Sequence, residues 1–337
     1  MSGLKKLYYK ASSMLPISLF RSGGPAGLLL PYHHTVSDEE LQHICHLYPY
    51  KNIQQFSDDL DFLLKYYKPV SAADVSKSIS EQKALPAGSF LLTFDDGFRE
   101  VYDIIAPILE KKGVPAIFFI NPSFIGNMVL FYRCKISLLI GELKRNEQPR
   151  SKIYAEVLGI KSATPYQLME ALKKIDQTNA SLLDTIADAT GYSFTHYLSK
   201  QRPFLTDEEV AHLHRRGFDI GAHSMDHPYY KLLSEEEQVW QTVNSCECVK
   251  EITGSNECHF SFPHSDMDIS QATISSINLA KNGLLFGIQN QKEELNNNIL
   301  HRFNAERPET NIEALVKGQI ILNRLQKMAG RNSVKRN

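Results

Sequence analysis

The chain has 337 residues, of which 42% are hydrophobic, so it can form one large domain or two ordinary ones with a proper core. Its 37 basic and 38 acidic residues leave a formal net charge of -1, which argues against a nucleic-acid-binding surface and favours a sugar-like or other small substrate. The five cysteines are irregularly spaced, a pattern typical of reduced thiols in a cytosolic protein of this size.

The N-terminal segment, residues 1–25, begins with the lysines of a signal peptide but lacks its apolar stretch. Lys10, Ser12 and Ser13 interrupt the hydrophobic residues, and no part of the chain approaches the ~20 apolar residues of a membrane span. We therefore expect a cytoplasmic protein whose N-terminal helix packs on the domain. The alternative is a peripheral contact between this basic, Leu- and Tyr-bearing segment and a membrane.

Residues 26–330 alternate between strand-like and helix-like patterns, which predicts a single α/β domain. The strand-like runs are "GLLLPYHH", "SFLLTF", "VPAIFFI", "FDIGAH", "CHFSF" and "LLFGI". Capping boxes predict three helix starts, at Thr206 with Glu209, Ser234 with Glu237, and Thr310 with Glu313. The alternation predicts a parallel sheet with helices outside, either an open doubly wound sheet or a closed barrel.

The stretch from about residue 127 to residue 203 does not follow this alternation. It is polar and helix-like, and it contains no convincing strand. We interpret it as a helical insertion between two units of the sheet. It could wall or cover a substrate cleft on the active-site side, or it could be surface decoration or a dimer contact.

Polar side chains follow the predicted strands, where α/β folds place their active sites. These residues are Asp95, Asp96 and Gly97, then Asn121, then His223 and His227, and then Pro263, His264 and Asp266. The carboxyl ends of parallel strands meet at one edge of the sheet, so we expect these side chains to lie close together.

"HSMDHP" places His223 and His227 four residues apart, a spacing at which two imidazoles can bind one ion. One aspartate of "FDDG" would complete a three-ligand metal site, and the other would serve as a general base toward water. Gly97 would let the backbone turn so that both carboxylates face the same site.

"TFDDG" followed by "HSMDH" resembles the first two motifs of the polysaccharide deacetylases, carbohydrate esterase family 4 with its NodB homology domain. The resemblance covers residues 86–126 and 204–305, with a looser match at "LLPYHHTVSD". It implies a distorted (β/α) barrel of seven or eight parallel strands that removes acetyl groups from N-acetylated sugars.

Carried over by position, the resemblance makes Asp95 the general base and gives the metal three ligands, Asp96, His223 and His227. Ser224 would help to fix the histidine loop. The expected metal is Zn²⁺, with Co²⁺, Ni²⁺ or Mn²⁺ as alternatives. The same ligand set also occurs in non-haem iron oxygenases, but that interpretation leaves Asp95 without a role.

Two family motifs depart from the usual pattern. The third motif often begins with arginine, whereas "SFPH" has Ser261 at that position, and serine cannot tune the base as arginine would. A backbone N–H near Pro263 and His264 would hold the oxyanion. The fifth motif, which carries the general acid, has no clean counterpart. "ILHRF" offers His301, or Arg302 as a supporting residue, His264 is the rival acid, and solvent is a further alternative.

His33 and His34 follow the first predicted strand, so either could line the site, or one could be buried and bonded to the backbone.

The leading hypothesis is a metal-dependent hydrolase that removes acetyl groups from N-acetylated sugars of a cell-surface polysaccharide or glycolipid precursor. The alternatives are a catalytically impaired sugar-binding homologue and a hydrolase of another non-peptide C–N bond or of an O-acetyl ester. A second carboxylate beside the metal favours an enzyme, because a binding protein has no use for it.

Overall fold

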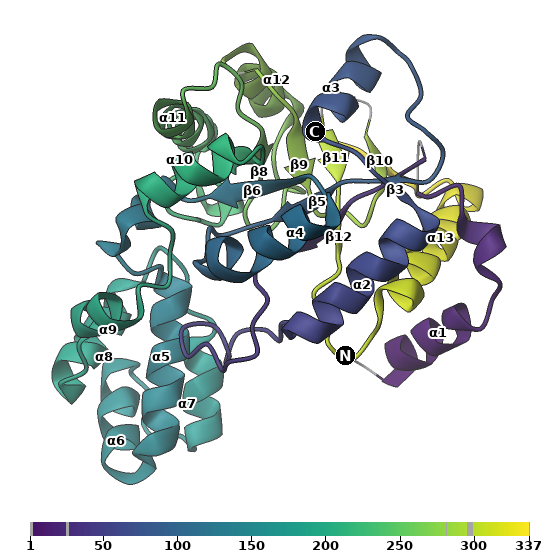
Figure 1. Ribbon diagram of the computed structural model, residues 1–337. Helices are drawn as coiled ribbons and strands as arrows, with labels where there is room; N and C mark the ends of the chain where they lie inside the picture. The colour runs from purple at the N-terminus through teal and green to yellow at the C-terminus, as the bar shows by residue number, and fades with distance from the viewer. Residues whose placement is uncertain (1–2, 25–26, 281, 295–298, 337) are drawn as a thin grey trace. The chain divides into compact units, whose positions relative to one another are not determined.

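A computed structural model describes residues 3–24, 27–280, 282–294 and 299–336. The chain forms two compact units (Figure 1). The larger comprises Met1–Asp38, Tyr50–Pro122 and Asp207–Asn337, and the smaller comprises Glu39–Pro49 and Ser123–Thr206.

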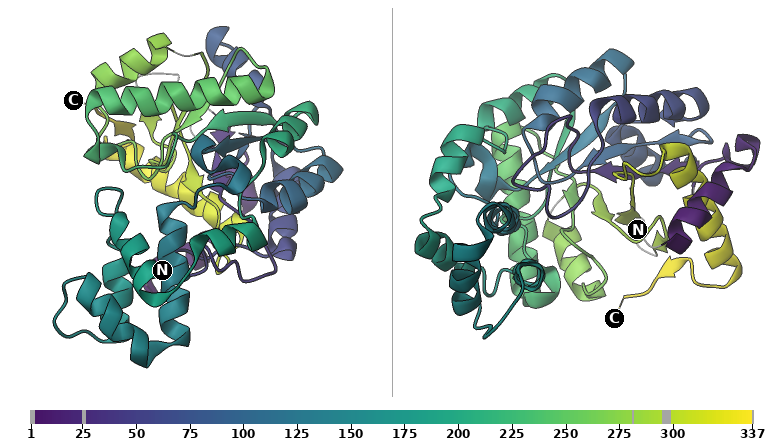
Figure 2. Two further views of the ribbon diagram at one scale, coloured as in Figure 1. Left: turned by 90° about the vertical axis from the view of Figure 1, so that its left-hand side faces the viewer. Right: turned by 90° about the horizontal axis from the view of Figure 1, so that it is seen from below.

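The centre of the larger unit is a sheet in which all neighbouring strands are parallel, in the order β11-β9-β8-β7-β6-β5-β2-β12. Its strands are β2 (Pro31–His33), β5 (Leu92–Phe94), β6 (Ala116–Ile120), β7 (Asp219–Ala222), β8 (Phe260–Ser261), β9 (Leu285–Gly287), β11 (Ile299–His301) and β12 (Phe303–Asn304). Helices of the same unit surround these strands, as Figure 2 shows in its right-hand view.

The two edge strands of this sheet are consecutive parts of one segment, since only Arg302 separates β11 from β12. β11 pairs with β9 and β12 pairs with β2. Around the junction, the Arg302 N–H donates to Gly287 O at 2.8 Å, and the Phe303 N–H donates to Leu30 O at 3.0 Å. One segment therefore bridges both edges of the sheet. Of the two predicted architectures, this confirms the distorted barrel rather than the open sheet.

The helices of the larger unit are α1 (Gly3–Ser13), η1 (Ile17–Phe20), α2 (Ile53–Tyr66), α3 (Ala72–Ser80), η3 (Val101–Ile105), α4 (Ala106–Lys112), α10 (Asp207–Arg215), η5 (Tyr230–Leu232), α11 (Glu235–Thr253), α12 (Gln271–Ala280) and α13 (Ile312–Met328).

The larger unit also has two small parallel sheets. The first consists of β1 (Leu28–Leu29), β4 (Ser89–Phe90) and β3 (Lys68–Pro69), and the second consists of β10 (Glu293–Glu294) and β13 (Ser333–Val334).

Two of the three helix starts predicted from capping boxes are correct. Ser234 forms the predicted capping box at the start of α11, and α10 begins at Asp207, directly after Thr206. The predicted cap at Thr310 is wrong by one residue. Asn311 caps α13 instead, because its side-chain oxygen accepts from the Ala314 N–H at 2.9 Å.

Apolar side chains from several strands form a buried cluster in this unit. Its members are Leu28, Leu30, Val70, Ala72, Val75, Leu91, Ile117, Phe119, Leu284 and Phe286. The Arg302 guanidinium lies 5.5 Å from the Phe119 ring centroid and 4.9 Å from that of Tyr32. The cluster therefore provides an apolar wall against which this cation is fixed.

The smaller unit is mostly helical, as predicted for residues 127–203. It contains α5 (Tyr132–Arg145), α6 (Glu147–Val157), α7 (Pro165–Leu172), α8 (Ser181–Thr190) and α9 (Phe194–Gln201), and the 3-10 segment η4 (Pro122–Asn127) leads into it. The insertion, with residues 39–49, makes up the smaller unit, and a single domain over residues 26–330 stays a prediction. Leu139, Leu168, Leu183 and Ile186 are fully buried, so the insertion has apolar residues enough for a core of its own. Its proposed role beside the substrate stays a prediction.

Candidate active site

Asp96, His223 and His227 come together from the loops that follow β5 and β7. The Asp96 Oδ1 atom lies 3.5 Å from His223 Nε2 and 3.2 Å from His227 Nε2. All three side chains are buried, and their ligand atoms lie within 4.8 Å of one another. The structure thus gathers the three residues that the sequence analysis assigned to the metal.

The protonation pattern of this triad fits a bound dication. His223 Nδ1 donates to the Ser261 carbonyl oxygen at 2.7 Å, which leaves the Nε2 lone pair directed at Asp96. Burial lowers the pKa of His223 to about 4, so the ring is neutral at pH 7. Among the described residues, the buried Asp96 Oδ1 has no hydrogen-bond partner of good geometry. A cation would satisfy this oxygen and the imidazole lone pair together.

The ligand loops adopt a backbone conformation that few residues tolerate. Asp96, Ser224 and His227 have φ angles of 75°, 66° and 59°, and Gly97 follows at 64°. A side chain at Gly97 would meet Ile120 Cγ2 at 3.1 Å, so glycine is required there for space as well as for conformation.

Short hydrogen bonds hold the histidine loop in this shape. The Ser224 hydroxyl accepts from the His227 N–H at 3.0 Å, as its predicted supporting role requires. The Asn121 amide, at the end of β6, donates to the carbonyl oxygens of His223 and Ser224. Strain of this kind, held by surrounding bonds, is typical of functional loops.

Asp95 lies beside the triad but is held by a different partner. Arg302 donates to both of its carboxylate oxygens, at 2.7 Å to Oδ1 and 2.8 Å to Oδ2, and the nearest triad nitrogen, His223 Nε2, is 4.0 Å away. Burial by itself would raise the pKa of Asp95, but Arg302 and His223 together hold it below its usual value. The carboxylate is therefore ionised and able to accept a proton.

Arg302 brings a guanidinium to Ser261, the position at which the third motif often has its arginine. Its Nη2 atom also donates to Ser261 Oγ at 2.5 Å, and its Nη1 atom donates to Thr93 Oγ1 at 2.9 Å. Ser261, which replaces the usual arginine, thus contacts the guanidinium that arrives from the closing strand. Arg302 was expected to support the site, and in the structure it does so by contacting Asp95 directly.

His34 is held by the carboxylate of Glu306, a residue that the sequence analysis missed. Glu306 Oε2 lies 2.7 Å from His34 Nδ1, and Glu306 Oε1 accepts from the backbone N–H groups of His34 and Thr35. Burial by itself would lower the pKa of His34, but Glu306 outweighs it and raises the pKa to about 9. Asp96 and Asp95 also contribute to this rise, so His34 is a cation that interacts electrostatically with these carboxylates.

The sequence profile of the family described as polysaccharide deacetylase matches residues 82–280, more than half of the chain. The chain belongs to the polysaccharide deacetylase family. The matched range includes Asp95, Asp96, His223 and His227, whereas His34, Arg302 and Glu306 lie outside it. No curated protein sequence matches the chain.

Several solved deacetylase structures share the fold. Streptococcus pyogenes deacetylase PplD, in complex with acetate, is 13% identical over 87% of this chain and 97% of its own, with a TM-score of 0.56. IcaB from Ammonifex degensii is 16% identical over 87% and 97%, with a TM-score of 0.54. A de-N-acetylase from Aggregatibacter actinomycetemcomitans is 14% identical over 86% and 99%, with a TM-score of 0.53. At these identities the likeness concerns the fold.

His264 lies at the edge of the deacetylase site. Its ring stacks on Tyr229 with 3.6 Å between centroids and meets the His227 ring edge-on at 4.4 Å. The residue has a φ of 57°, and the preceding Pro263 is buried after β8. The place is compatible with the predicted contact to substrate or oxyanion, while a role for His264 as the acid stays a prediction.

His301 is not placed with the other site residues of the deacetylase, which corrects its assignment as a candidate acid. Its side chain is completely buried, with Nε2 at 2.9 Å from Glu294 Oε2 and Nδ1 at 3.7 Å from Asp266 Oδ2. Arg336 donates to both carboxylates. Both ring nitrogens therefore face structural carboxylates, and Asp266, also considered as a strand-end residue, belongs to this cluster.

His33 likewise points away from the site. Its ring stacks on Phe94 and meets Phe56 edge-on, and burial lowers its pKa well below the usual value. Of the two histidines considered after the first strand, His34 interacts electrostatically with Asp95 and Asp96, whereas His33 is a neutral core residue.

Proposed function

We propose that this polysaccharide deacetylase is a metal-dependent hydrolase that removes the acetyl group from an N-acetylated sugar in a cell-surface polysaccharide or glycolipid precursor. The observation that carries the proposal is an ionised carboxylate, Asp95, held by Arg302 beside a converging Asp-His-His triad. Family membership supports an acetylated polysaccharide as the substrate, and the acetate complex of PplD is consistent with the same product.

Asp96, His223 and His227 would hold the metal, which when bound would polarise the acetamide carbonyl and acidify a water molecule. Asp95 accepts the proton of the attacking water, and Arg302 keeps its carboxylate in one orientation. The backbone N–H of His264, whose ring contacts that of His227, would donate to the developing oxyanion.

His34 is our candidate for the general acid that protonates the departing amine. It is held by Glu306 at 2.7 Å, and Glu306, Asp96 and Asp95 raise its pKa so that it is cationic. The Glu306 carboxylate fixes the ring and keeps it protonated, as carboxylates do for histidine acids in hydrolases.

The function is tested by measuring acetate release from N-acetylated oligosaccharides. We expect the chelator-treated protein to lose at least about 10²-fold in turnover and to recover it with Zn²⁺, Co²⁺, Ni²⁺ or Mn²⁺, because the metal supplies the main charge stabilisation. An O-acetylated oligosaccharide is the matched control. Release of acetate from the ester alone would favour an esterase, and binding without any release would favour a sugar-binding homologue.

Replacing Glu306 with glutamine should shift the alkaline limb of the pH–rate profile to lower pH. The acid must be protonated, so the rate falls as the pH rises through the pKa of His34, which Glu306 raises to about 9. Without that charge, burial dominates and the pKa falls. The rate at pH 8 should then drop more than the rate at pH 6. Glu309→Gln, at a nearby exposed carboxylate, is the control, and identical profiles for the two variants would exclude His34 as the acid.

We further propose that α1, η1 and α13 together form a surface that contacts an anionic membrane; we call it the α1–α13 surface. Residues 1–37 contain four Lys or Arg and no Asp or Glu. Residues 312–337 contain six Lys or Arg and one acidic residue, Glu313, and two of the six, Lys317 and Arg336, are buried in ion pairs. The two segments pack together (Figure 1), for example through the Tyr8 hydroxyl, which donates to Gly318 O at 2.5 Å. The large apolar side chains that are exposed on the α1–α13 surface are Leu7, Met14, Leu15, Leu19, Leu325 and Met328.

Such a surface fits a peripheral contact, and no helix in the described residues is long and apolar enough to span a bilayer. We expect the protein to sediment with vesicles that contain phosphatidylglycerol and not with pure phosphatidylcholine, and to be released by high salt. Leu325→Ser combined with Met328→Ser should weaken binding, whereas Leu279→Ser, at an exposed position of α12, should not. Equal sedimentation with both vesicle types would contradict the proposal. The contact would lie on the cytoplasmic face if the predicted location holds.

A further inference from the structure

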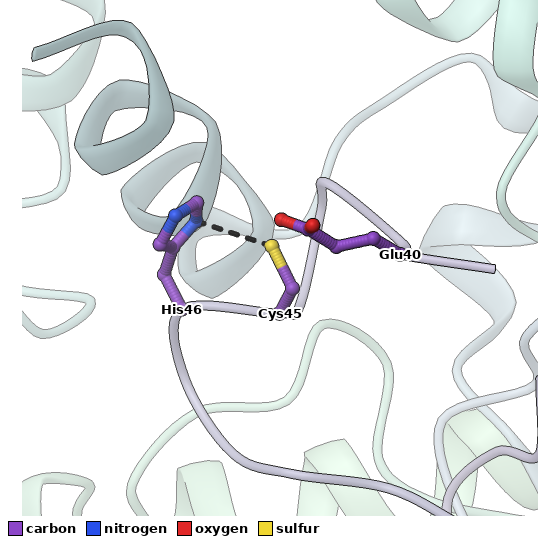
Figure 3. A group of neighbouring side chains, drawn as sticks. All are labelled: Glu40, Cys45 and His46. Atoms are coloured by element: carbon purple, nitrogen blue, oxygen red, sulfur yellow. Dashed lines mark hydrogen bonds between the residues drawn. The ribbon is translucent and has the colours of Figure 1, made fainter. Parts of the chain in front are cut away.

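The loop Glu39–Pro49 of the smaller unit gathers a carboxylate, a thiol and an imidazole, none of which belongs to a motif used above (Figure 3). Glu40, Cys45 and His46 each offer one ligand atom, and these atoms lie within 4.8 Å of one another. Cys45 Sγ is 3.3 Å from His46 Nδ1, and in Figure 3 the Glu40 carboxylate approaches the sulfur from the side opposite the imidazole. The proposed chemistry of the deacetylase site does not use any of them.

The spacing of these atoms matches the coordination shell of one ion. With Zn–S bonds of about 2.3 Å and Zn–N bonds of about 2.0–2.1 Å in tetrahedral geometry, two such ligands lie roughly 3.5 Å apart. The 3.3 Å between Cys45 Sγ and His46 Nδ1 is close to that separation. Glu40 is exposed, so its side chain can adjust by rotation to complete the shell.

Neighbouring groups fix the loop in the conformation that brings the ligands together. The N–H groups of Ile44 and Cys45 both donate to Leu41 O at 2.9 Å, which forms a tight turn. The Ser137 hydroxyl of α5 donates to Gln42 O at 2.7 Å and lies 3.3 Å from both the His46 N–H nitrogen and Nδ1.

The helix α5 also provides the space that His46 needs. A Cβ atom added at Gly141 would lie 3.3 Å from His46 Cε1, so the glycine allows a close approach of the ring to the helix. The ligands are therefore supported by a rigid element, as metal sites require.

We propose that Glu40, Cys45 and His46 bind one Zn²⁺-like divalent ion at a site separate from the Asp96–His223–His227 triad. Binding forms a sulfur–metal bond and releases the thiol proton of Cys45 to solvent, with no change of oxidation state. A carboxylate, a thiolate and a neutral imidazole balance the charge of a dication, and a water molecule completes four-coordination.

Without a cation the same groups are poorly suited to other chemistry. Burial and the neighbouring Glu40 raise the pKa of Cys45 to about 11, so the thiol is protonated and a weak nucleophile at pH 7. Burial and Lys144 lower the pKa of His46, which leaves its ring neutral and available as a ligand. A dication would reverse the cost of forming the thiolate. It would also tie the loop to α5 and stabilise the smaller unit.

Cobalt distinguishes the two sites spectroscopically, because only the loop site contains sulfur. We expect the metal-stripped full-length protein to bind two equivalents of Co²⁺, one of them with a thiolate-to-cobalt charge-transfer band in the near ultraviolet. Cys45→Ser should abolish the band, bind one equivalent and keep deacetylase activity. Cys248→Ser, a half-buried cysteine on α11 of the larger unit, should keep both equivalents and the band.

Asp96→Asn separates this proposal from the proposed function, because it should remove the other equivalent and leave the band intact. His46→Gln should weaken the binding that gives the band at least about 10-fold, since it deletes a ligand. Binding of a single equivalent without a charge-transfer band, or a band that survives in Cys45→Ser, would overturn the loop site and leave the assignment of the Asp-His-His triad untouched.

Discussion

Replacing Asp95 with asparagine should lower turnover by about 10²- to 10⁴-fold, the loss typical of removing a general base, while the metal content stays unchanged. The amide keeps the size of the side chain but cannot accept the proton of water. Asp95 is bonded to Arg302 through both oxygens, so the triad does not depend on it as a ligand. Turnover on an N-acetylated oligosaccharide and metal content per protein are the two measurements.

Asp96→Asn is the informative comparison, because it changes the adjacent residue by the same chemistry. A neutral amide is a weaker ligand for a dication, so this variant should lose metal as well as activity. Asp103→Asn, at an exposed carboxylate paired with Arg99, controls for the charge change alone. Equal loss of metal from both active-site variants, or full activity in Asp95→Asn, would show that the two carboxylates do not divide their roles in this way.

Replacing Arg302 with glutamine should destabilise the protein at pH 7 by about 3–5 kcal/mol, the range for a buried ion pair that loses one partner. The guanidinium is fully buried and bonded to Asp95, Thr93 and Ser261, so the variant leaves a buried carboxylate without its cation. Urea unfolding measures the loss. Asp95→Asn combined with Arg302→Gln should cost less than the sum of the two single changes, because the double variant has no orphaned charge.

The pH dependence of this variant follows from the direction of the pKa of Asp95. In the wild type the folded-state pKa is depressed, so the pair contributes stability above the unfolded-state pKa, and the contribution is lost as the pH falls through the folded-state pKa. Without Arg302, burial raises the pKa of Asp95, and the acidic limb of the activity profile should move to higher pH. The deficit in stability should shrink as the pH falls through the raised pKa of Asp95 in the variant. A deficit that is independent of pH would indicate lost packing rather than lost charge.

The convergence of Asp95, Asp96, His223 and His227 could be predicted because their signals are local in the chain. Asp95 and Asp96 are adjacent, His223 and His227 are four residues apart, and all four stand directly after strands with a clear apolar pattern. Strand ends and motif spacing therefore suffice to bring these residues to one place.

The partners of these residues could not be predicted because they depend on barrel closure. Arg302 is separated from Asp95 by 207 positions, and Glu306 from His34 by 272. His301 ends β11 and Arg302 follows it in the same extended segment, so their side chains face opposite sides, and only the register decides which one reaches Asp95. The same alternation separates His33 from His34. Glu306 lies shortly after β12, as Asp95 lies directly after β5. This position after a strand was the one feature of the sequence that could have marked Glu306 as a site residue.

The segment that bridges both edges of the barrel has a consequence for biosynthesis. A ribosome releases Asp95 long before it releases Arg302, so a nascent chain that ends before residue 299 has the edges of β2 and β9 unpaired and lacks the cation that compensates the base. Such a chain exposes strand edges prone to aggregation and cannot bury Asp95 as a charge without a large penalty. The ability to fold and the ability to deprotonate water should therefore arise together, after translation of the final strand, and truncated products should be cleared by proteases rather than persist as partly active fragments.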